Sequence, residues 1–210
     1  MKRARHQQEI CIIFSRYPRP GASKTRLIPH LGPEGAAGLQ RRMTEAVAGQ
    51  AACLGQVHVE LAMAGATEDE MASWLGKQFP WQQQVGEDLG QRMDFAFGQA
   101  FKRGFQRVVI VGADCPELST DMITQAFQEL REKELVLGPT SDGGYYLVGL
   151  RRPAPALFAG ISWGSDRVLV QTLAIARKQG LPPALLAKLS DVDLPDDLKK
   201  LPPSLRGELF

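Results

Sequence analysis

RVVIVGADCP, residues 107–116, contains the strongest candidate for a buried strand in this chain. Residues 108–111 are an unbroken apolar run of valine and isoleucine that ends at Gly112. Such a short run without alternation is typical of a strand buried on both faces, as in a parallel sheet covered by helices. Asp114 follows at the exit of this strand, where an unpaired acid would be costly to desolvate.

Candidate strands and helices alternate on both sides of this run. Strands are expected at residues 9–15, 57–63, 81–85, 107–114, 134–140, 144–150 and 184–193. Helices are expected at residues 33–55, 67–79, 90–104, 119–133 and 165–180, with a short one from Pro195. Pro33 suits a first helical turn, Thr67 and Ser119 are capping residues, and Gly180 suits a helix end. This order predicts a three-layer α/β domain with a mainly parallel mixed sheet, and residues 1–210 as a single domain.

The composition is that of an ordinary globular protein, with 44% hydrophobic and 23% charged residues. The net charge of +2 gives no reason to expect a nucleic-acid or anionic-membrane partner. No apolar run approaches the ~20 residues of a membrane span, and the start lacks the apolar stretch of a secretory signal. A cytoplasmic protein is therefore expected. Cys11 and Cys53 are predicted to be reduced and buried, and Cys115 to serve packing.

RYPRPGASKTR, residues 16–26, is a cation-rich loop after the first predicted strand. Aligning Lys24 and Thr25 with the end of the P-loop pattern G-x-x-x-x-G-K-[ST] places Pro18 and Ser23 where glycines belong, so a Walker-type ATPase is not predicted. Arginine and lysine do suit phosphate recognition. Two interpretations of the loop stay open from spacing alone: a solvated basic loop and a phosphate-binding loop.

Acidic residues follow three other strands. Asp114 either caps the turn before a proline or holds Mg²⁺, which prefers carboxylate, water and phosphate oxygens. Asp142, Gly143 and Gly144 either form a hairpin turn or allow a ligand close to the backbone. Asp193 ends the last predicted strand and is a candidate second carboxylate for a metal held by Asp114.

Six stretches in this order resemble the radical-SAM/selenodomain-associated transferase family of the nucleotide-diphospho-sugar transferase superfamily. The matching stretches are IIFSRYPRPGASKTRLIPHLG, GEDLGQRM, VVIVGADCPEL, GPTSDGGYYLVGL, the WGS of ISWGSDRV, and DVDLPDDL. They extend from Ile12 to Leu198. The KTRL and DGG elements are also similar to those of 2-phospholactate guanylyltransferases.

The resemblance implies a Rossmann-like GT-A fold and a set of site residues. The loop after the first strand would hold the phosphates of a nucleotide, through Arg16, Gly21, Lys24 and Arg26. Asp114 and Asp193 would bind a divalent metal, Mg²⁺ or Mn²⁺. Asp142, Gly143 and Gly144 would lie on the acceptor side, and Gly90 and Arg92 near the base or the acceptor.

Residues and resemblance together predict a metal-dependent transferase whose partners are a nucleoside triphosphate or a nucleotide-sugar and a small acceptor. The first hypothesis is a nucleotidyltransferase that joins a nucleoside monophosphate to a phosphorylated or hydroxyl acceptor and releases pyrophosphate. Lys24 and Arg26 would then hold the pyrophosphate. The second is a glycosyltransferase with Asp142 as the acceptor base. The third is a non-catalytic nucleotide-binding protein. The acceptor, the base and the oligomeric state are not predicted.

Overall fold

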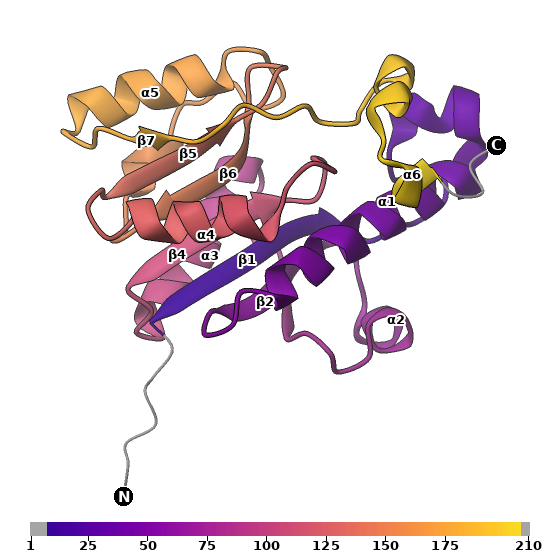
Figure 1. Ribbon diagram of the computed structural model, residues 1–210, viewed down its shortest axis with the longest axis horizontal. Coiled ribbons are helices and arrows are strands. Elements are labelled where there is room, and N and C mark those ends of the chain that lie inside the picture. Colours follow the sequence, from indigo (N-terminus) through magenta and orange to yellow (C-terminus); the bar gives the residue numbers. More distant parts are fainter. Residues whose placement is uncertain (1–7, 207–210) are drawn as a thin grey trace, which may run out of the picture.

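A seven-stranded sheet in the order β3-β2-β1-β4-β6-β5-β7 forms the centre of the protein, whose computed structural model describes residues 8–206 (Figure 1). The strands are β1 (Glu9–Arg16), β2 (His58–Ala64), β3 (Trp81–Gln83), β4 (Arg107–Gly112), β5 (Leu135–Pro139), β6 (Tyr145–Leu150) and β7 (Ala184–Leu185). Only β6 runs against its neighbours, β4 and β5; the other pairs are parallel. The predicted mainly parallel mixed sheet is therefore confirmed.

Helices cover both faces of this sheet (Figure 1). The helices are α1 (Ile28–Ala52), α2 (Glu68–Trp74), α3 (Leu89–Lys102), α4 (Thr120–Glu129), α5 (Val168–Lys178) and α6 (Pro203–Arg206). Short 3₁₀ turns lie at Thr25–Leu27, Pro155–Phe158 and Pro195–Lys200. Helices α1, α2 and α4 pack on one face, and α3 and α5 pack on the other. This is the predicted three-layer α/β arrangement.

Strand β1 shows why the central strands are apolar on both sides. Cys11 and Ile13 belong to the core beneath α1 and α4, whereas Ile10 and Ile12 belong to the core beneath α3 and α5. Successive side chains of a strand point to opposite faces, and both faces here are covered, so no alternation with polar residues is required.

Helix α1 begins earlier than predicted but contains a break at the predicted start. Gly32 has φ 68° and ψ 168°, which interrupts the helix and separates a first turn from the long regular segment that Pro33 opens. Proline in the first turn loses no hydrogen bond, and glycine accepts the positive φ. The caps predicted at Thr67 and Ser119 are both formed, by hydrogen bonds from the backbone N–H of Glu70 and Met122.

The last predicted strand, residues 184–193, is mostly not a strand. Ala184–Leu185 pair with β5, and Thr140 and Leu189 form an isolated bridge farther along. Pro139 at the end of β5 has no N–H to donate to the ladder. The chain therefore follows β5 with interrupted pairing and leaves the sheet at the edge where the candidate site residues lie.

The end of the chain packs on the start of α1. Val192, Leu198, Leu201 and Leu205 form a separate apolar cluster with residues that include Leu27, Leu39 and Met43. Figure 1 shows this yellow C-terminal segment, with α6, lying beside the purple helix α1. The cluster holds the segment that carries Asp193 against the loop that carries Lys24 and Arg26.

Within residues 8–206, no helix is both long enough and apolar enough to span a membrane. The first seven residues, on which the expectation about a secretory signal partly rests, lie outside the described range. The expected cytoplasmic location stays a prediction.

Two of the three cysteine predictions are confirmed and one is wrong. Cys11 and Cys115 are buried, but Cys53 is exposed. Cys53 follows the end of α1, two residues beyond the buried Ala51, and two residues turn a helix by about 200°. Its side chain therefore points away from the core.

Thiol reactivity should separate these cysteines. We expect an aromatic disulfide reagent to modify Cys53 rapidly in the folded protein and to spare Cys11 and Cys115, because burial raises the pKa of both buried thiols, that of Cys11 to about 12. Mass spectrometry of the modified protein measures this. The Cys53→Ser variant should react only after denaturation; fast reaction of that variant under native conditions would contradict the packing of β1 and of the turn after β4.

Candidate active site

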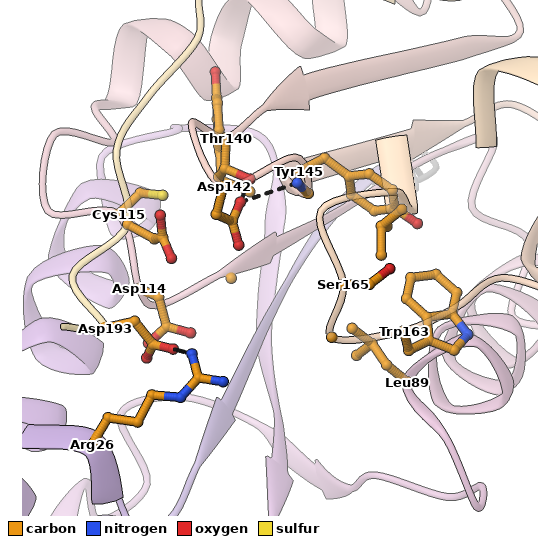
Figure 2. A pocket seen from close by; sticks show the side chains of 16 residues that line it. Arg26, Leu89, Asp114, Cys115, Thr140, Asp142, Tyr145, Trp163, Ser165 and Asp193 are labelled. Carbon is orange, nitrogen blue, oxygen red and sulfur yellow. Dashed lines mark hydrogen bonds and ion pairs between the residues drawn. The ribbon is translucent and has the colours of Figure 1, made fainter. Parts of the chain in front are cut away.

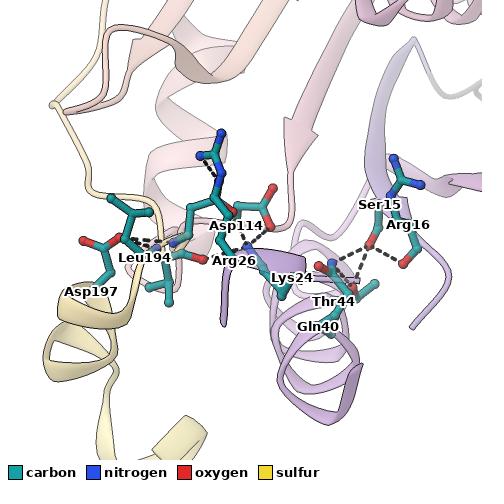
Figure 3. Close-up of polar contacts among 11 residues, drawn as sticks. Ser15, Arg16, Lys24, Arg26, Gln40, Thr44, Asp114, Leu194 and Asp197 are labelled. Carbon is teal, nitrogen blue, oxygen red and sulfur yellow. Dashed lines mark hydrogen bonds and ion pairs between the residues drawn. The ribbon is translucent and has the colours of Figure 1, made fainter. Parts of the chain in front are cut away.

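One edge of the sheet collects the polar residues. The parallel strands β1, β4 and β5 all end there, followed by Lys24, Asp114 and Asp142 respectively. In open α/β sheets, ligands bind outside the carboxyl ends of the strands. The candidate residues from four separate sequence stretches therefore share one region, as Figures 2 and 3 show.

Asp193 reaches this region through a backbone hydrogen bond. The N–H of Val192 donates to the carbonyl oxygen of Asp114 over 2.9 Å. This bond holds the last irregular segment directly against the residue that follows β4. Asp114 and Asp193 are distant in the sequence, but in the folded chain their carboxylates lie on either side of one positively charged side chain.

That group is the ammonium of Lys24. Its Nζ donates to Asp114 Oδ1 over 2.5 Å, to the carbonyl oxygen of Val192 over 2.7 Å and to Asp193 Oδ1 over 3.5 Å (Figure 3). Only 3% of the Lys24 side chain is exposed. Burial by itself lowers the pKa of this lysine, but the negative charges and hydrogen bonds of Asp114 and Asp193 outweigh burial and raise it. Lys24 is therefore charged, with all three donors engaged.

The backbone of Lys24 is unusual as well. Its φ of 47° makes it the only non-glycine residue with a positive φ in the described chain, 8–206. A left-handed conformation in such a residue costs ~1–3 kcal/mol and tends to occur at functional sites. With this backbone conformation, the side chain lies between the two carboxylates.

Arg26 completes the cluster from the solvent side. Its Nη1 lies 3.1 Å from Asp193 Oδ2, with 66% of the arginine side chain and 42% of the aspartate side chain exposed. An exposed ion pair of this kind contributes little to stability. Arg26 is therefore free to exchange its partner for an incoming anion.

Two adjoining hollows open around this cluster. The first, which we call the cationic hollow, encloses about 700 Å³. Its charged lining residues are Arg16, Lys24, Arg26, Arg92, Asp114 and Asp193. Four cations against two acids make it suited to a polyanion such as a phosphate chain.

The second hollow, which we call the acidic cavity, encloses about 300 Å³ (Figure 2). Its charged lining residues are Arg26, Asp114, Asp142, Asp191 and Asp193. Asp142 is held by neutral donors: the hydroxyl of Thr140 over 2.5 Å and the N–H of Gly144 over 3.0 Å, both to Oδ1. Leu89, Tyr145 and Trp163 form an apolar wall of this cavity.

Three of the predicted glycines line neither hollow. Gly21 adopts φ 78° in an exposed turn. A Cβ on Gly90 would lie 2.7 Å from Trp163 Nε1, so this glycine lets α3 pack against Trp163. A Cβ on Gly143 would overlap the carbonyl oxygen of Asp166. Ligand roles for these three glycines stay predictions, while Gly90 and Gly143 allow close packing beside the acidic cavity.

The remaining predicted residues do face the hollows. Arg92 lines the cationic hollow, where its Nε donates to the carbonyl oxygen of Gly86 over 3.0 Å. Arg16 lines the same hollow, and Gly144 lines the acidic cavity. The structure thus brings together eight of the residues singled out from the sequence: Arg16, Lys24, Arg26, Arg92, Asp114, Asp142, Gly144 and Asp193.

Sequence reasoning missed Gln84, Tyr145, Trp163 and Asp191. Gln84 lines the cationic hollow and donates to the carbonyl oxygens of Ser15 and Ala62 at the ends of β1 and β2. It directly follows β3, so the position after a parallel strand was a usable signal. Asp191 stands two residues before Asp193, but a run of four nearby aspartates gave no reason to select it.

The oxygens around Lys24 fit a hard divalent cation. Across residues 8–206, no group of three or more His, Cys, Asp or Glu side chains could hold a metal ion. Two carboxylates and a carbonyl already surround a cation here, however. Mg²⁺ is commonly held by one or two carboxylates together with substrate phosphates and water, so this donor set suits it.

Solved structures define the class to which this fold belongs. A protein from Desulfovibrio desulfuricans G20, provisionally named a nucleotide-diphospho-sugar transferase, is 33% identical, with a TM-score of 0.85 over 89% of this chain and 83% of its own. The 4-diphosphocytidyl-2C-methyl-D-erythritol synthase of Anaerococcus prevotii is 10% identical, with a TM-score of 0.61 over 91% and 93% of the chains. The glucosyl-3-phosphoglycerate synthase of Mycobacterium tuberculosis is 11% identical, with a TM-score of 0.51 over 92% and 74%.

The fold is therefore that of the nucleotide-diphospho-sugar transferases, as the sequence resemblance implied. Residues 47–165 match the family described as an uncharacterized protein conserved in bacteria (DUF2064). The chain belongs to this family. No curated protein matches the chain in sequence. The radical-SAM association and the similarity to 2-phospholactate guanylyltransferases stay predictions.

The packing of Gly143 can be tested against a glycine of similar conformation. Gly143 and Gly164 have φ 91° and 79°, but a Cβ on Gly164 would meet nothing within 4 Å. We expect Gly143→Ala to lower the free energy of unfolding by ~1–3 kcal/mol more than Gly164→Ala does, since it adds a clash to the same backbone strain. Urea denaturation measures both. Equal losses would mean that the contact between Gly143 and Asp166 does not hold the loop.

Proposed function

We propose that the protein is a metal-dependent transferase acting on a nucleotide, and specifically a nucleotidyltransferase that uses a nucleoside triphosphate. The observation that carries this proposal is the cluster of Lys24 and Arg26 with Asp114 and Asp193 at the edge of the cationic hollow. Cations for a phosphate chain and carboxylates for a divalent cation meet there at the carboxyl ends of the strands. This is the combination that phosphoryl and nucleotidyl transfer require.

In the proposed reaction, an acceptor oxygen attacks the α-phosphorus of the triphosphate. An oxygen–phosphorus bond forms, the bond between the α-phosphorus and the bridging oxygen breaks, and pyrophosphate leaves with the bonding electron pair. Arg16, Lys24 and Arg26 would bind the triphosphate and stabilise the leaving pyrophosphate. Asp114 and Asp193 would hold Mg²⁺ or Mn²⁺, which when bound neutralises charge on phosphate oxygens.

Proteins of similar fold support the broader part of this proposal, a transferase that acts on a nucleotide. The Mycobacterium tuberculosis synthase was solved with Mn²⁺, uridine diphosphate and phosphoglyceric acid, and the Anaerococcus protein is named as a synthase of a diphosphocytidyl compound. Both glycosyl and nucleotidyl transfer are therefore represented on this fold, which makes a nucleotide and a divalent metal reasonable partners for this chain. Residues 1–210 as a single catalytic domain are part of the same proposal.

A glycosyltransferase with a nucleotide-sugar donor is the second candidate function. The observation that favours it is Asp142 in the acidic cavity, because an acceptor hydroxyl needs a base when it attacks an anomeric carbon. The single aspartate directly after β4, in place of a pair of aspartates around one residue, favours nucleotidyl transfer. A non-catalytic nucleotide-binding protein is the third candidate.

Thermal unfolding with candidate ligands tests the proposal. We expect one or more nucleoside triphosphates with Mg²⁺ or Mn²⁺ to raise the melting temperature, because a ligand that binds only the folded state stabilises it. Asp114→Asn should abolish the metal-dependent part of this shift and keep part of the nucleotide shift. Stabilisation by nucleotide-sugars and by no triphosphate would favour the second candidate, and an unchanged metal-dependent shift in Asp114→Asn would refute the metal role.

Lys24 gives a second, independent test. Its ammonium occupies the space between the two carboxylates, so a metal and Lys24 compete for the same oxygens when no nucleotide is bound. We expect Lys24→Met to bind Mn²⁺ about tenfold more tightly in the absence of nucleotide, through the loss of one competing charge, and to bind triphosphate more weakly. Electron paramagnetic resonance of free Mn²⁺ measures the first effect and calorimetry the second.

Two variants serve as controls for Lys24. Lys24→Arg keeps the charge and should leave Mn²⁺ affinity close to that of the original protein. Arg92→Met removes a cation of the same hollow that hydrogen-bonds Gly86 and, within residues 8–206, forms no ion pair with either carboxylate. Unchanged or weaker Mn²⁺ binding in Lys24→Met would show that the lysine does not stand in the metal position.

A further inference from the structure

The two adjoining hollows differ in charge although they share a wall. Arg26, Asp114 and Asp193 line both of them. Beyond these shared residues, the cationic hollow adds Arg16, Lys24 and Arg92, whereas the acidic cavity adds Asp142 and Asp191. One side of the shared wall therefore attracts anions, and the other side repels them.

The two acids that belong to the acidic cavity alone are not neutralised by cations. Asp142 is held by the hydroxyl of Thr140 and the N–H of Gly144, which carry no charge. Asp191 lies in the same lining, and within residues 8–206 neither acid forms an ion pair with a lysine or an arginine. In the described part of the chain, Arg26 is the single cation of this lining, and it lies on the wall shared with the cationic hollow, where the proposed function assigns it to the triphosphate. A phosphorylated ligand in this cavity would then face the carboxylates of Asp142 and Asp191 without a cation of its own.

The same cavity has an apolar wall next to its carboxylates. Tyr145 and Trp163 meet edge to face with their ring centroids 6.3 Å apart, and Leu89 lies in the same lining with 43% of its surface exposed. Burial raises the pKa of Tyr145, so its hydroxyl stays neutral. Figure 2 shows Trp163 and Leu89 across the opening from Asp142 and Asp114.

This combination fits one class of small molecule. Ionised carboxylates only accept hydrogen bonds, so they suit the hydroxyl groups of a polyol. An aromatic wall packs against the C–H face of such a molecule and supplies the apolar contact that a polar surface lacks. Within residues 8–206, both hydrogen bonds recorded for Asp142 end on Oδ1, which leaves Oδ2 to accept from a ligand hydroxyl.

We propose that the acceptor of this transferase is an uncharged polyhydroxylated molecule of monosaccharide size, bound in the acidic cavity between Asp142, Asp191 and Trp163. The inference rests on the proposed function and narrows it, because it excludes a phosphorylated acceptor. In the transfer step, the hydroxyl oxygen bonds to the α-phosphorus, pyrophosphate leaves, and the hydroxyl proton passes to Oδ2 of Asp142. The cavity volume of about 300 Å³ suits one ring of this size.

The indole N–H of Trp163 provides a local readout. The chain has three tryptophans, so the heteronuclear NMR spectrum of the full protein should contain three indole signals, and Trp163→Phe assigns the one in the cavity. Trp74 donates its indole N–H to Glu45 outside both hollows and serves as the internal control. Matched pairs of probes are glycerol and glycerol 3-phosphate, glucose and glucose 6-phosphate, and inositol and its monophosphate.

We expect at least one neutral probe to shift the Trp163 signal and to leave Trp74 unchanged at concentrations up to about 100 mM, since small polar ligands bind weakly. Its phosphorylated partner should act on Trp163 at least about tenfold more weakly. In the double variant Asp142→Asn with Asp191→Asn, that preference should fall or reverse. Circular dichroism of the double variant verifies that the protein is folded.

Two outcomes would overturn the proposal: a phosphorylated probe that shifts Trp163 as strongly as its neutral partner, and no neutral probe that shifts Trp163 at all. The proposed function is tested separately, by the rise in melting temperature that nucleoside triphosphates cause. A polyol shift without any nucleotide binding would reject the transferase and keep the acidic cavity as a polyol site. Nucleotide binding with a phosphate preference at Trp163 would keep the transferase and reject the neutral acceptor.

Discussion

The ammonium of Lys24 between Asp114, Asp193 and the carbonyl oxygen of Val192 is the interaction on which the arrangement of this site depends. It joins the loop after the first strand to the turn after β4 and to the last irregular segment. Two carboxylates this close repel each other unless a cation lies between them. A lysine in a strained backbone conformation supplies that cation. In the proposed function, a metal would take this place and the charge of the lysine would serve the triphosphate.

The rest of the fold supports this contact from two directions. The hydrogen bond from Val192 to Asp114 holds the last segment against the central strand. The apolar cluster of Val192 and the C-terminal leucines with Leu27 and Leu39 holds it against the start of α1. Lys24 and Arg26 lie just before Leu27, so packing in this cluster sets the position of both cations. The apolar packing of this cluster thus determines where Lys24 and Arg26 can pair with the carboxylates.

The division of the site into a cationic and an acidic part follows from topology. Strand β1 and the loop after it deliver most of the cations, whereas β5 and the segment beside it deliver Asp142 and Asp191. Because β4 lies between these two halves of the sheet, Asp114 stands at the boundary and lines both hollows. A nucleotide on one side and a neutral acceptor on the other would meet at this residue.

Hydrophobic period, capping residues and the position after a buried strand are local signals, so most helices and strands could be predicted from the sequence. These signals predicted the sheet type, the caps at Thr67 and Ser119, and Asp114 and Lys24 as site candidates. The exposure of Cys53, the packing of Gly90 and Gly143, and the position of Trp163 and Asp191 in the acidic cavity became visible only in the folded chain. These depend on contacts between segments far apart in the chain, and no local pattern of residues records which segments will meet.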